Sequence, residues 1–283
     1  MPVNTDTIAA ALGNTSADRL IIDKASISNM TAGAFCSLWR ATGQPAQAAI
    51  PGTTPAVPNS ATTGAPALTN QTDPVQNFLL WAYAASGNSA MSLEIWDRVA
   101  HVGGLVLNST SQQNITGLNL DASGLNLSAA RRGASNYSDI QWFLETYTDG
   151  GATASNATIN VTYDDDTTGN LNTQAVGGTL RASRLLPLTP LIPSGSQGKF
   201  IKGINSVTLS ASTGTAGNFG FTAVRPRTAL MLETANKTAV ADWALLGLPV
   251  IPPDACLMYA LLTSTTSTGT LRGGAKVGAI STT

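Results

Sequence analysis

Few residues in this sequence could carry out chemistry, and the single histidine is the first to consider. His101 follows Asp97 and Arg98 at the end of an apolar segment. An Asp–His pair can orient a serine nucleophile in a hydrolase triad, but the Gly-x-Ser-x-Gly motif that would mark such a serine is absent. A charged pair and a turn-forming aspartate are ordinary at the end of a strand, and we favour that interpretation.

Two glutamates form a second candidate site. Glu94 and Glu145 lie on two segments of similar pattern. Glycosidases use two carboxylates that stand about 5 to 9.5 Å apart across a cleft. The sequence gives this pairing no further support, so it remains a glycan-cleaving alternative.

Three consecutive aspartates are the densest cluster of possible metal ligands. Asp164, Asp165 and Asp166 follow Tyr163 and precede Thr-Thr-Gly. Calcium takes several oxygen ligands from one compact loop, but the spacing of an EF-hand is absent. Because Asp and Gly are equally typical of turns, we predict a turn here and no metal site.

Aromatic side chains could form a platform on which sugar rings stack. Their positions within apolar, strand-like segments instead favour packing in a core. The six candidates are Trp81, Tyr83, Trp96, Trp142, Tyr147 and Tyr259.

Cysteine and histidine are too sparse for a zinc site. Cys36 and Cys256 lie far apart in apolar surroundings, which predicts two buried free thiols. No phosphate-binding glycine loop is visible either. The sequence therefore predicts no catalytic residue, no cofactor and no metal, and we expect that the protein is not an enzyme.

The chain carries unusually little charge. Charged residues make up 11% of its 283 residues and the net charge is -1, against about 25% charged residues in an ordinary globular protein. The 15 Lys and Arg residues are scattered, which disfavours nucleic-acid binding. Weak long-range repulsion favours contact between copies, and we expect a homo-oligomer, with a trimer as one form.

Alternating apolar residues recur in pairs of segments separated by Gly, Ser and Thr. Period-two alternation predicts strands with one buried face, and the glycines suit tight turns. We therefore predict an all-β fold, a sandwich or jelly roll built from repeated hairpins. The paired segments are 78–87 with 92–96, 142–147 with 157–163, 206–210 with 219–224, and 256–262 with 270–272.

A proline-rich stretch precedes this body. Six prolines between positions 45 and 74 forbid a helix, so residues 41–73 are expected to form an extended arm or a draped loop. We predict an N-terminal segment over 1–74 and a β-sandwich body over 75–283, with possible subdomains at about 75–180 and 181–283. Short helical turns before a first strand are expected within residues 5–40.

The first residues lack the features of an export signal. They have no basic region and too short an apolar run, and no stretch reaches the roughly 20 apolar residues that span a bilayer. We therefore expect a protein made in the cytoplasm, with no membrane partner.

Several phrases of the sequence resemble structural proteins of tailed bacteriophages. They are SLWRATG (37–43), FLL (78–80), IWDR (95–98), GGL (103–105), WFLETYTDGG (142–151) and VTLSASTGTAGNFG (207–220). The resemblance runs over most of the chain and implies a component of the virion, with no catalytic residues to carry over.

Three roles remain open at this point. A capsid decoration or cement protein is favoured, because a polar, weakly charged β-body with an extended arm suits docking on the major capsid protein and on other copies. The first alternative is a tail, collar or fibre-base protein. The second is a module that binds or cleaves glycans on the host surface.

Overall fold

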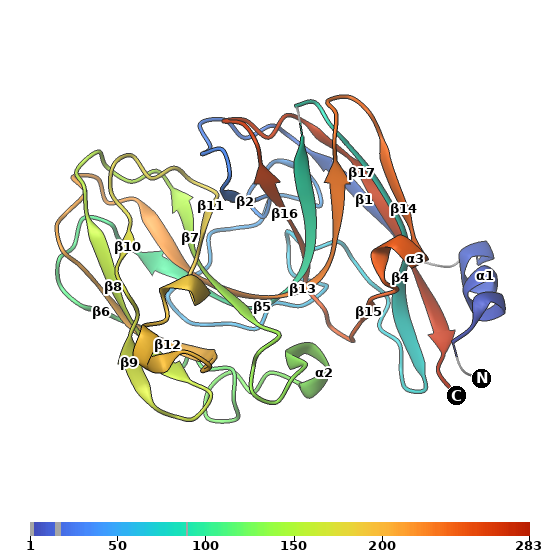
Figure 1. Cartoon of the computed structure of the whole chain (residues 1–283), viewed down its shortest axis with the longest axis horizontal. Coiled ribbons are helices and arrows are strands. Elements are labelled where there is room, and N and C mark those ends of the chain that lie inside the picture. Colours follow the sequence, from blue (N-terminus) through green and yellow to red (C-terminus); the bar gives the residue numbers. More distant parts are fainter. Residues whose placement is uncertain (1–2, 15–17, 89) are drawn as a thin grey trace. The chain divides into compact units, whose positions relative to one another are not determined.

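The computed structural model describes residues 3–14, 18–88 and 90–283, and strands dominate it (Figure 1). The helices are short: α1 (Thr5–Gly13), α2 (Ala129–Arg132) and α3 (Trp243–Leu246), with 3-10 turns at Thr189–Leu191 and Ser194–Ser196. The predicted all-β sandwich class is confirmed. The short helix before a first strand is also confirmed, because Asn4 caps α1 and β1 follows it.

The chain forms two compact units, each discontinuous in sequence. Unit 1 comprises Met1–Ala48, Asn59–Asp97 and Pro226–Thr283, and unit 2 comprises Ala49–Pro58 and Arg98–Arg225. This division differs from the predicted subdomains 75–180 and 181–283. The strands β5 (Met91–Leu105) and β13 (Asn218–Leu232) continue from one unit into the other. A boundary inside a strand leaves no change in composition for sequence reasoning to detect.

Unit 1 contains one large antiparallel sheet, in the order β14-β4-β17-β1-β3, with β15 also paired to β4. We call it the outer sheet. Its strands are β1 (Asp18–Lys24), β3 (Gly43–Gln44), β4 (Val75–Ser86), β14 (Ala239–Asp242), β15 (Val250–Ile251) and β17 (Leu271–Ser281). A second layer in unit 1 pairs β16 (Leu257–Thr263) with β2 (Phe35–Ser37) and with the first part of β5.

Unit 2 repeats the arrangement with different strands. One sheet has the order β10-β8-β12-β6, with β9 paired to β8. Its strands are β6 (Gln113–Asn114), β8 (Asn156–Tyr163), β9 (Thr168–Asn170), β10 (Gln174–Ala175) and β12 (Ile201–Leu209). In the second layer, β7 (Gln141–Thr148) pairs with β11 (Arg184–Pro187) and with the first part of β13.

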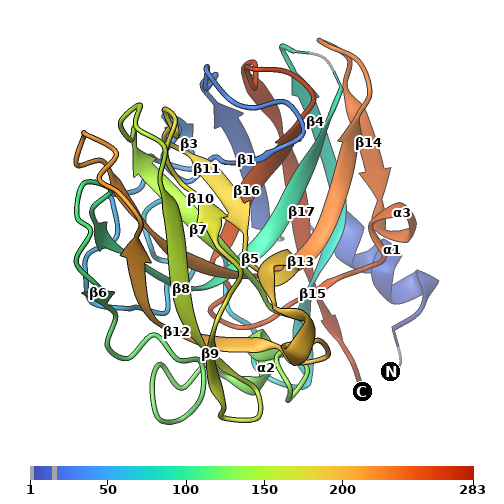
Figure 2. The same cartoon turned by 60° about the vertical axis from the view of Figure 1, so that its left-hand side comes forward.

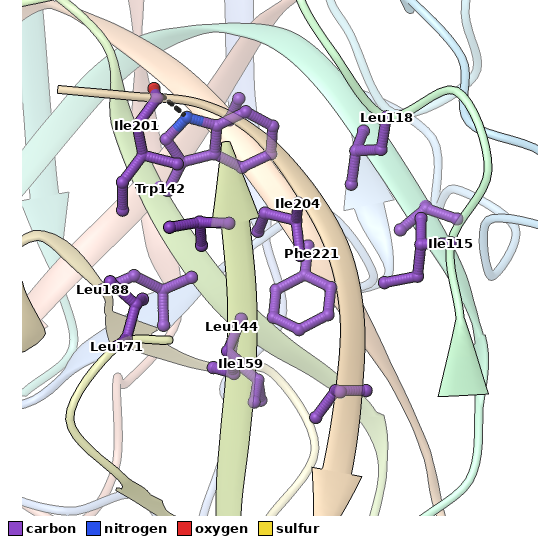
Figure 3. Packing of buried hydrophobic residues seen from close by; sticks show 14 of the residues in the cluster. Ile115, Leu118, Trp142, Leu144, Ile159, Leu171, Leu188, Ile201, Ile204 and Phe221 are labelled. Carbon is purple, nitrogen blue, oxygen red and sulfur yellow. Dashed lines mark hydrogen bonds between the residues drawn. The ribbon is translucent and has the colours of Figure 1, made fainter. Parts of the chain in front are cut away.

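Each unit has its own hydrophobic core. In unit 1 the core joins outer-sheet residues such as Leu20 and Leu79 with Leu93 and Tyr259 of the other layer. In unit 2, Trp142 packs in a cluster with Phe221 and Ile204, and its indole Nε1 donates to the carbonyl oxygen of Ile201 at 2.8 Å (Figure 3). Each unit is thus a sandwich whose two layers share one core.

The predicted hairpins are wrong, although the strands themselves are present. In all four predicted pairs the second strand joins a different sheet from the first: β4 to β5, β7 to β8, β12 to β13 and β16 to β17. The chain therefore crosses from one layer of a sandwich to the other at these turns. Alternation could not reveal this, because a strand facing the core from either side shows the same inward-and-outward pattern.

The proline-rich stretch is a draped loop in this structure, not a free arm. Ala48 and Pro58 are buried, and the Ala48 amide donates to the Trp39 carbonyl at 3.1 Å. Farther along, Ala56 exchanges two backbone hydrogen bonds with His101, each 3.0 Å long. Proline has no backbone donor for a sheet, but amides such as those of Ala48 and Ala56 donate to carbonyl oxygens of the same chain.

Candidate functional site

Asp97 and His101, the candidate hydrolase pair, bind different partners. Arg98 Nε donates to His101 Nδ1 at 3.0 Å. Burial, followed by the Arg98 charge, lowers the pKa of His101 to about 3, so its ring is neutral at physiological pH. Asp97 accepts hydrogen bonds from Arg227 Nη2 (3.0 Å) and from the Cys256 amide (2.9 Å). The structure thus shows Asp97 as an ion-paired anchor and does not place it as the orienter of a catalytic base.

Glu145 lies at the centre of a buried polar cluster in unit 2. Its side chain is 1% exposed and its Oε2 lies 2.8 Å from Arg98 Nη2. The hydroxyl groups of Thr222 and Tyr147 donate to the same oxygen at 2.5 and 3.2 Å, and Arg98 Nη2 also donates to the Tyr147 hydroxyl oxygen at 3.1 Å. Burial and the Glu145 charge raise the pKa of Tyr147.

This arrangement satisfies Glu145 but keeps it from solvent. A carboxylate held by three side chains inside a sandwich cannot reach a glycan at the surface. Glu94 belongs to unit 1, where it accepts a hydrogen bond of 2.6 Å from the Ser92 hydroxyl. The geometry therefore gives the glycosidase hypothesis no support from Glu145.

The acidic run forms a turn that lysines neutralise. Asp165 lies 2.8 Å from Lys199 Nζ, and Asp166 pairs with Lys202. Asp164 accepts a hydrogen bond of 2.8 Å from the Phe200 amide. The residues that the structure describes include no group of three or more His, Cys, Asp or Glu arranged to hold a metal ion. Ion pairs with two lysines and a backbone hydrogen bond thus hold this turn in place.

Most of the aromatic candidates lie in the two cores. Trp96, Trp142, Tyr147 and Tyr259 are all buried. Trp81 and Tyr83 instead lie on the outward face of β4 in unit 1, with ring centroids 4.8 Å apart. Only this pair retains any exposed aromatic surface for a ligand among the six residues. The prediction of two buried free thiols, Cys36 and Cys256, is confirmed.

Exposed apolar side chains are concentrated in unit 1. Within residues 3–14, 18–88 and 90–283, the large hydrophobic residues that are exposed all belong to this unit: Ile21, Tyr83, Met231, Val240, Leu245 and Val250. Monomeric proteins rarely leave large contiguous apolar patches exposed. Unit 1 is therefore the part of the molecule with an unpartnered apolar surface.

Strand register lines up part of this surface across the outer sheet. Ile21 of β1 is opposite Gly274 of β17, Gly274 is opposite Tyr83 of β4, and Tyr83 is opposite Val240 of β14. We call these four residues the apolar row. Ile21 is 62% exposed, Val240 58% and Tyr83 36%. The row crosses four neighbouring strands on the face that points away from the core.

Charged residues border the apolar row. On one side Arg272 pairs with Asp23, with Nε 3.5 Å from the carboxylate. On the other side lie Arg19, Lys276 and Asp242, each two residues along its strand from a member of the row. An apolar centre with a charged border has the composition of a protein interface.

The remaining part of the same face is already covered by α1. Ile8 and Ala11 of this helix pack with Phe78, Leu80 and Ile280 of the outer sheet. The Lys276 ammonium donates to the carbonyl oxygen of Leu12 near the end of the helix. Both views show α1 beside β4 and β17, near one end of these strands (Figure 1, Figure 2). The row lies on the uncovered part.

Sequence reasoning missed this surface, although a signal was present. The segment Asp18–Lys24 buries Leu20, Ile22 and Lys24 and exposes Ile21 and Asp23. Strict alternation would have placed Ile21 opposite the buried pair, and an isoleucine on the polar face of a strand is the unusual residue.

Comparisons with known proteins leave the family open. No family model matches the chain, and no curated protein matches it. Three solved structures of infectious bursal disease virus show weak likeness. The Gt strain virus is 9% identical, with 95% of this chain and 83% of that chain covered and a TM-score of 0.16. The VP2 subviral particle is 12% identical, with 98% of this chain and 86% of that chain covered and a TM-score of 0.19. The derived T=1 particles are 11% identical, with 96% of this chain and 82% of that chain covered and a TM-score of 0.20. Such TM-scores lie far below those of chains that share a fold, so they assign this chain no function.

No helix among the described residues is long and apolar enough to cross a membrane.

Proposed function

We propose that this chain is a structural protein of a tailed-bacteriophage virion, with capsid decoration or cement as its role. The observation that carries the proposal is the apolar row on a chain whose net charge is only -1. A protein present in many copies on a lattice needs an exposed apolar contact surface and little charge repulsion between neighbouring copies, and this chain has both features. The phage-like phrases of the sequence supply the link to a virion.

The proposed docking surface differs from the one expected from the sequence. Residues 41–73 pack on their own chain, so deleting them would damage both units. In this proposal the exposed face of the outer sheet is the contact surface, because more than half of the surface of Ile21 and of Val240 is open to solvent. The expected partners remain other copies of the chain and the major capsid protein.

Stoichiometry tests this proposal and separates its two structural forms. Particles from a lysate of the phage that encodes this chain would be purified on a density gradient, and peptides of the chain would be counted by quantitative mass spectrometry against the major capsid protein. A decoration protein should occur at a copy number comparable with that of the capsid subunit. A tail or collar protein would occur at a small fraction of it, and absence from particles would contradict both forms.

A glycan-binding module is the second candidate, and Trp81 with Tyr83 is the observation that favours it. Partly exposed aromatic rings on a rigid strand can stack on sugar rings. The variant Trp81→Ala should then abolish a glycan-induced change in tryptophan fluorescence, whereas a decoration protein should show no such change with any host-surface glycan.

A further inference from the structure

One groove in unit 1 collects three of the six large apolar residues that the described part of the chain exposes. Met231 of β13, Val240 of β14 and Leu245 of α3 line it, and they are 61%, 58% and 74% exposed. The groove has a volume of about 480 Å³, which is within the usual range of binding sites, about 300 to 1,000 Å³. Unit 1 therefore has a formed recess beside exposed apolar side chains.

The groove lies where the chain passes between the two layers of unit 1. At the end of β13, Leu230 and Leu232 enter the core, and Met231 between them is exposed. On β14, Ala241 enters the core and Val240 is exposed. β14 stands at one end of the order of the outer sheet, and an orange loop joins it to β13 (Figure 1, Figure 2). Core formation therefore leaves the groove uncovered at a sheet edge.

The loop between β13 and β14 adds one charge of each sign. Glu233 and Lys237 both line the groove, and within the described residues neither side chain has an ion pair or a hydrogen bond. The Lys237 amide donates to the Thr234 carbonyl oxygen at 3.3 Å, and the Asn236 amide donates to the Ser86 carbonyl oxygen at 2.7 Å. This anchored turn fixes the order of the two charges along the groove.

The charges select a second copy of the chain as the occupant. A partner must offer an apolar projection together with a base and an acid in the order opposite to that of the groove. A two-fold axis reverses the order of any pair of charges, so a second copy places its lysine against Glu233 and its glutamate against Lys237. Leu245 is the most exposed large apolar residue among those described, and it supplies the projection. A different protein would need this arrangement independently, whereas a second copy has it by symmetry.

We propose that two copies of this chain associate through a two-fold contact between their grooves. Leu245 of each copy enters the groove of the other, and Glu233 of each copy pairs with Lys237 of the other. The proposal rests on the self-association included in the proposed function, and it names the surface that performs it. The apolar row meets the groove only at Val240, so most of the row stays open to other neighbours in an assembly.

The size of the groove predicts weak association. Ten residues of each copy line it, whereas a stable interface uses about 20 to 30 residues from each partner. The ion pairs add little, because both charges are exposed and salt screens them. Association of this kind becomes effective when an assembly raises the local concentration to the millimolar range.

Sedimentation velocity of the full chain up to millimolar concentration tests the contact. The wild-type protein should show a monomer–dimer equilibrium. Leu245→Asp should raise the dissociation constant by about tenfold or more, because it places a carboxylate in the apolar part of the contact. Ile21→Asp is the matched control and should leave the dissociation constant unchanged. Ile21 has a side chain of the same size and is 62% exposed, but it lies three strand spacings from Val240, or about 14 Å.

Charge exchange in low-salt buffer tests the order of the ion pairs. Glu233→Lys alone and Lys237→Glu alone should each raise the dissociation constant by about tenfold, because both attractive pairs become repulsive. The double variant Glu233→Lys, Lys237→Glu should restore wild-type association. An equimolar mixture of the two single variants should form a heterodimer, since opposite charges then face each other again. Circular dichroism would verify that each variant is folded.

Three results would overturn the inference. The first is a wild-type chain that stays monomeric up to millimolar concentration, and the second is a dimer that Leu245→Asp weakens no more than Ile21→Asp does. The third is a mixture of the two single charge variants that associates no better than either variant alone. A monomeric chain that is still found on particles would contradict this contact alone. A dimer that is absent from all particles would instead contradict the virion role.

Discussion

The two units of this molecule treat their surfaces and interiors differently. Unit 2 neutralises a run of aspartates with Lys199 and Lys202 and pairs its buried Glu145 with Arg98. Unit 1 leaves Ile21, Tyr83 and Val240 exposed in one row across a sheet. Unit 2 shows that a sandwich of this chain can fold without a row of exposed large apolar residues. Folding alone therefore does not require the exposed row of unit 1, and we attribute this row to binding of a partner.

The largest expected effect separates the two faces of one strand in unit 1. Ile22 is 1% exposed and its neighbour Ile21 is 62% exposed. Ile22→Asp should lower the free energy of unfolding by about 4 kcal/mol or more, because it buries an unpaired charge. Ile21→Asp should change it by less than about 0.5 kcal/mol. Urea denaturation of both variants checks this, and a large loss with Ile21→Asp would show that the row serves folding.

A slightly smaller effect is expected in the interior of unit 2. Glu145→Ala leaves Arg98 buried without its partner and should cost about 3 to 5 kcal/mol of stability. Glu94→Ala in unit 1 removes one hydrogen bond from Ser92 and should cost about 1 kcal/mol. If urea denaturation showed the same loss in the free energy of unfolding for both variants, the buried Glu145–Arg98 pair would not contribute more to stability than the Glu94–Ser92 hydrogen bond.

Protonation of His101 should determine how the folding stability of unit 2 changes at acidic pH. Its pKa is lowered from 6.5 to about 3 in the folded protein, so the unfolded chain binds more protons between these values. Stability should therefore fall as the pH decreases from about 6.5 towards 3, by an amount on the order of 2 kcal/mol for a group with partial exposure. His101→Gln should show a flatter profile over this window in thermal unfolding. Parallel profiles for both proteins would refute the assignment.

The smallest expected effect is that of calcium. Lysines already pair with Asp165 and Asp166, so a cation would have to displace them. Millimolar calcium should leave the melting temperature unchanged, and Asp164→Asn should not alter that result. A rise with calcium that Asp164→Asn removes would mean that the turn is a binding site.

The sequence predicted the positions of strands far better than it predicted which strands pair with one another in a sheet. Alternation along 142–147 and 157–163 correctly indicated β7 and β8, yet these strands belong to different sheets. The turn glycines permit both a hairpin and a crossing between layers, and only long-range packing decides between them. Long-range packing also divides the segment 239–246, where Ala239–Asp242 pairs with β4 and Trp243–Leu246 is helical.

Candidate site residues were harder to predict than the fold. Burial decides whether Glu145 can act, and nothing local marks it as buried, because its partners Arg98 and Thr222 are distant in sequence. The apolar row is distributed over four strands from residue 21 to residue 274, so its members meet only through sheet register. The motifs of metal and nucleotide sites, by contrast, are local patterns that a sequence displays directly.

Electron cryomicroscopy of the particle that carries this chain tests the central claim most directly. The account predicts that the chain is present on the particle and that the outer face of unit 1, with Ile21, Tyr83 and Val240, is covered by a neighbouring copy. It would be contradicted by density in which this face points into solvent while unit 2 makes the contacts.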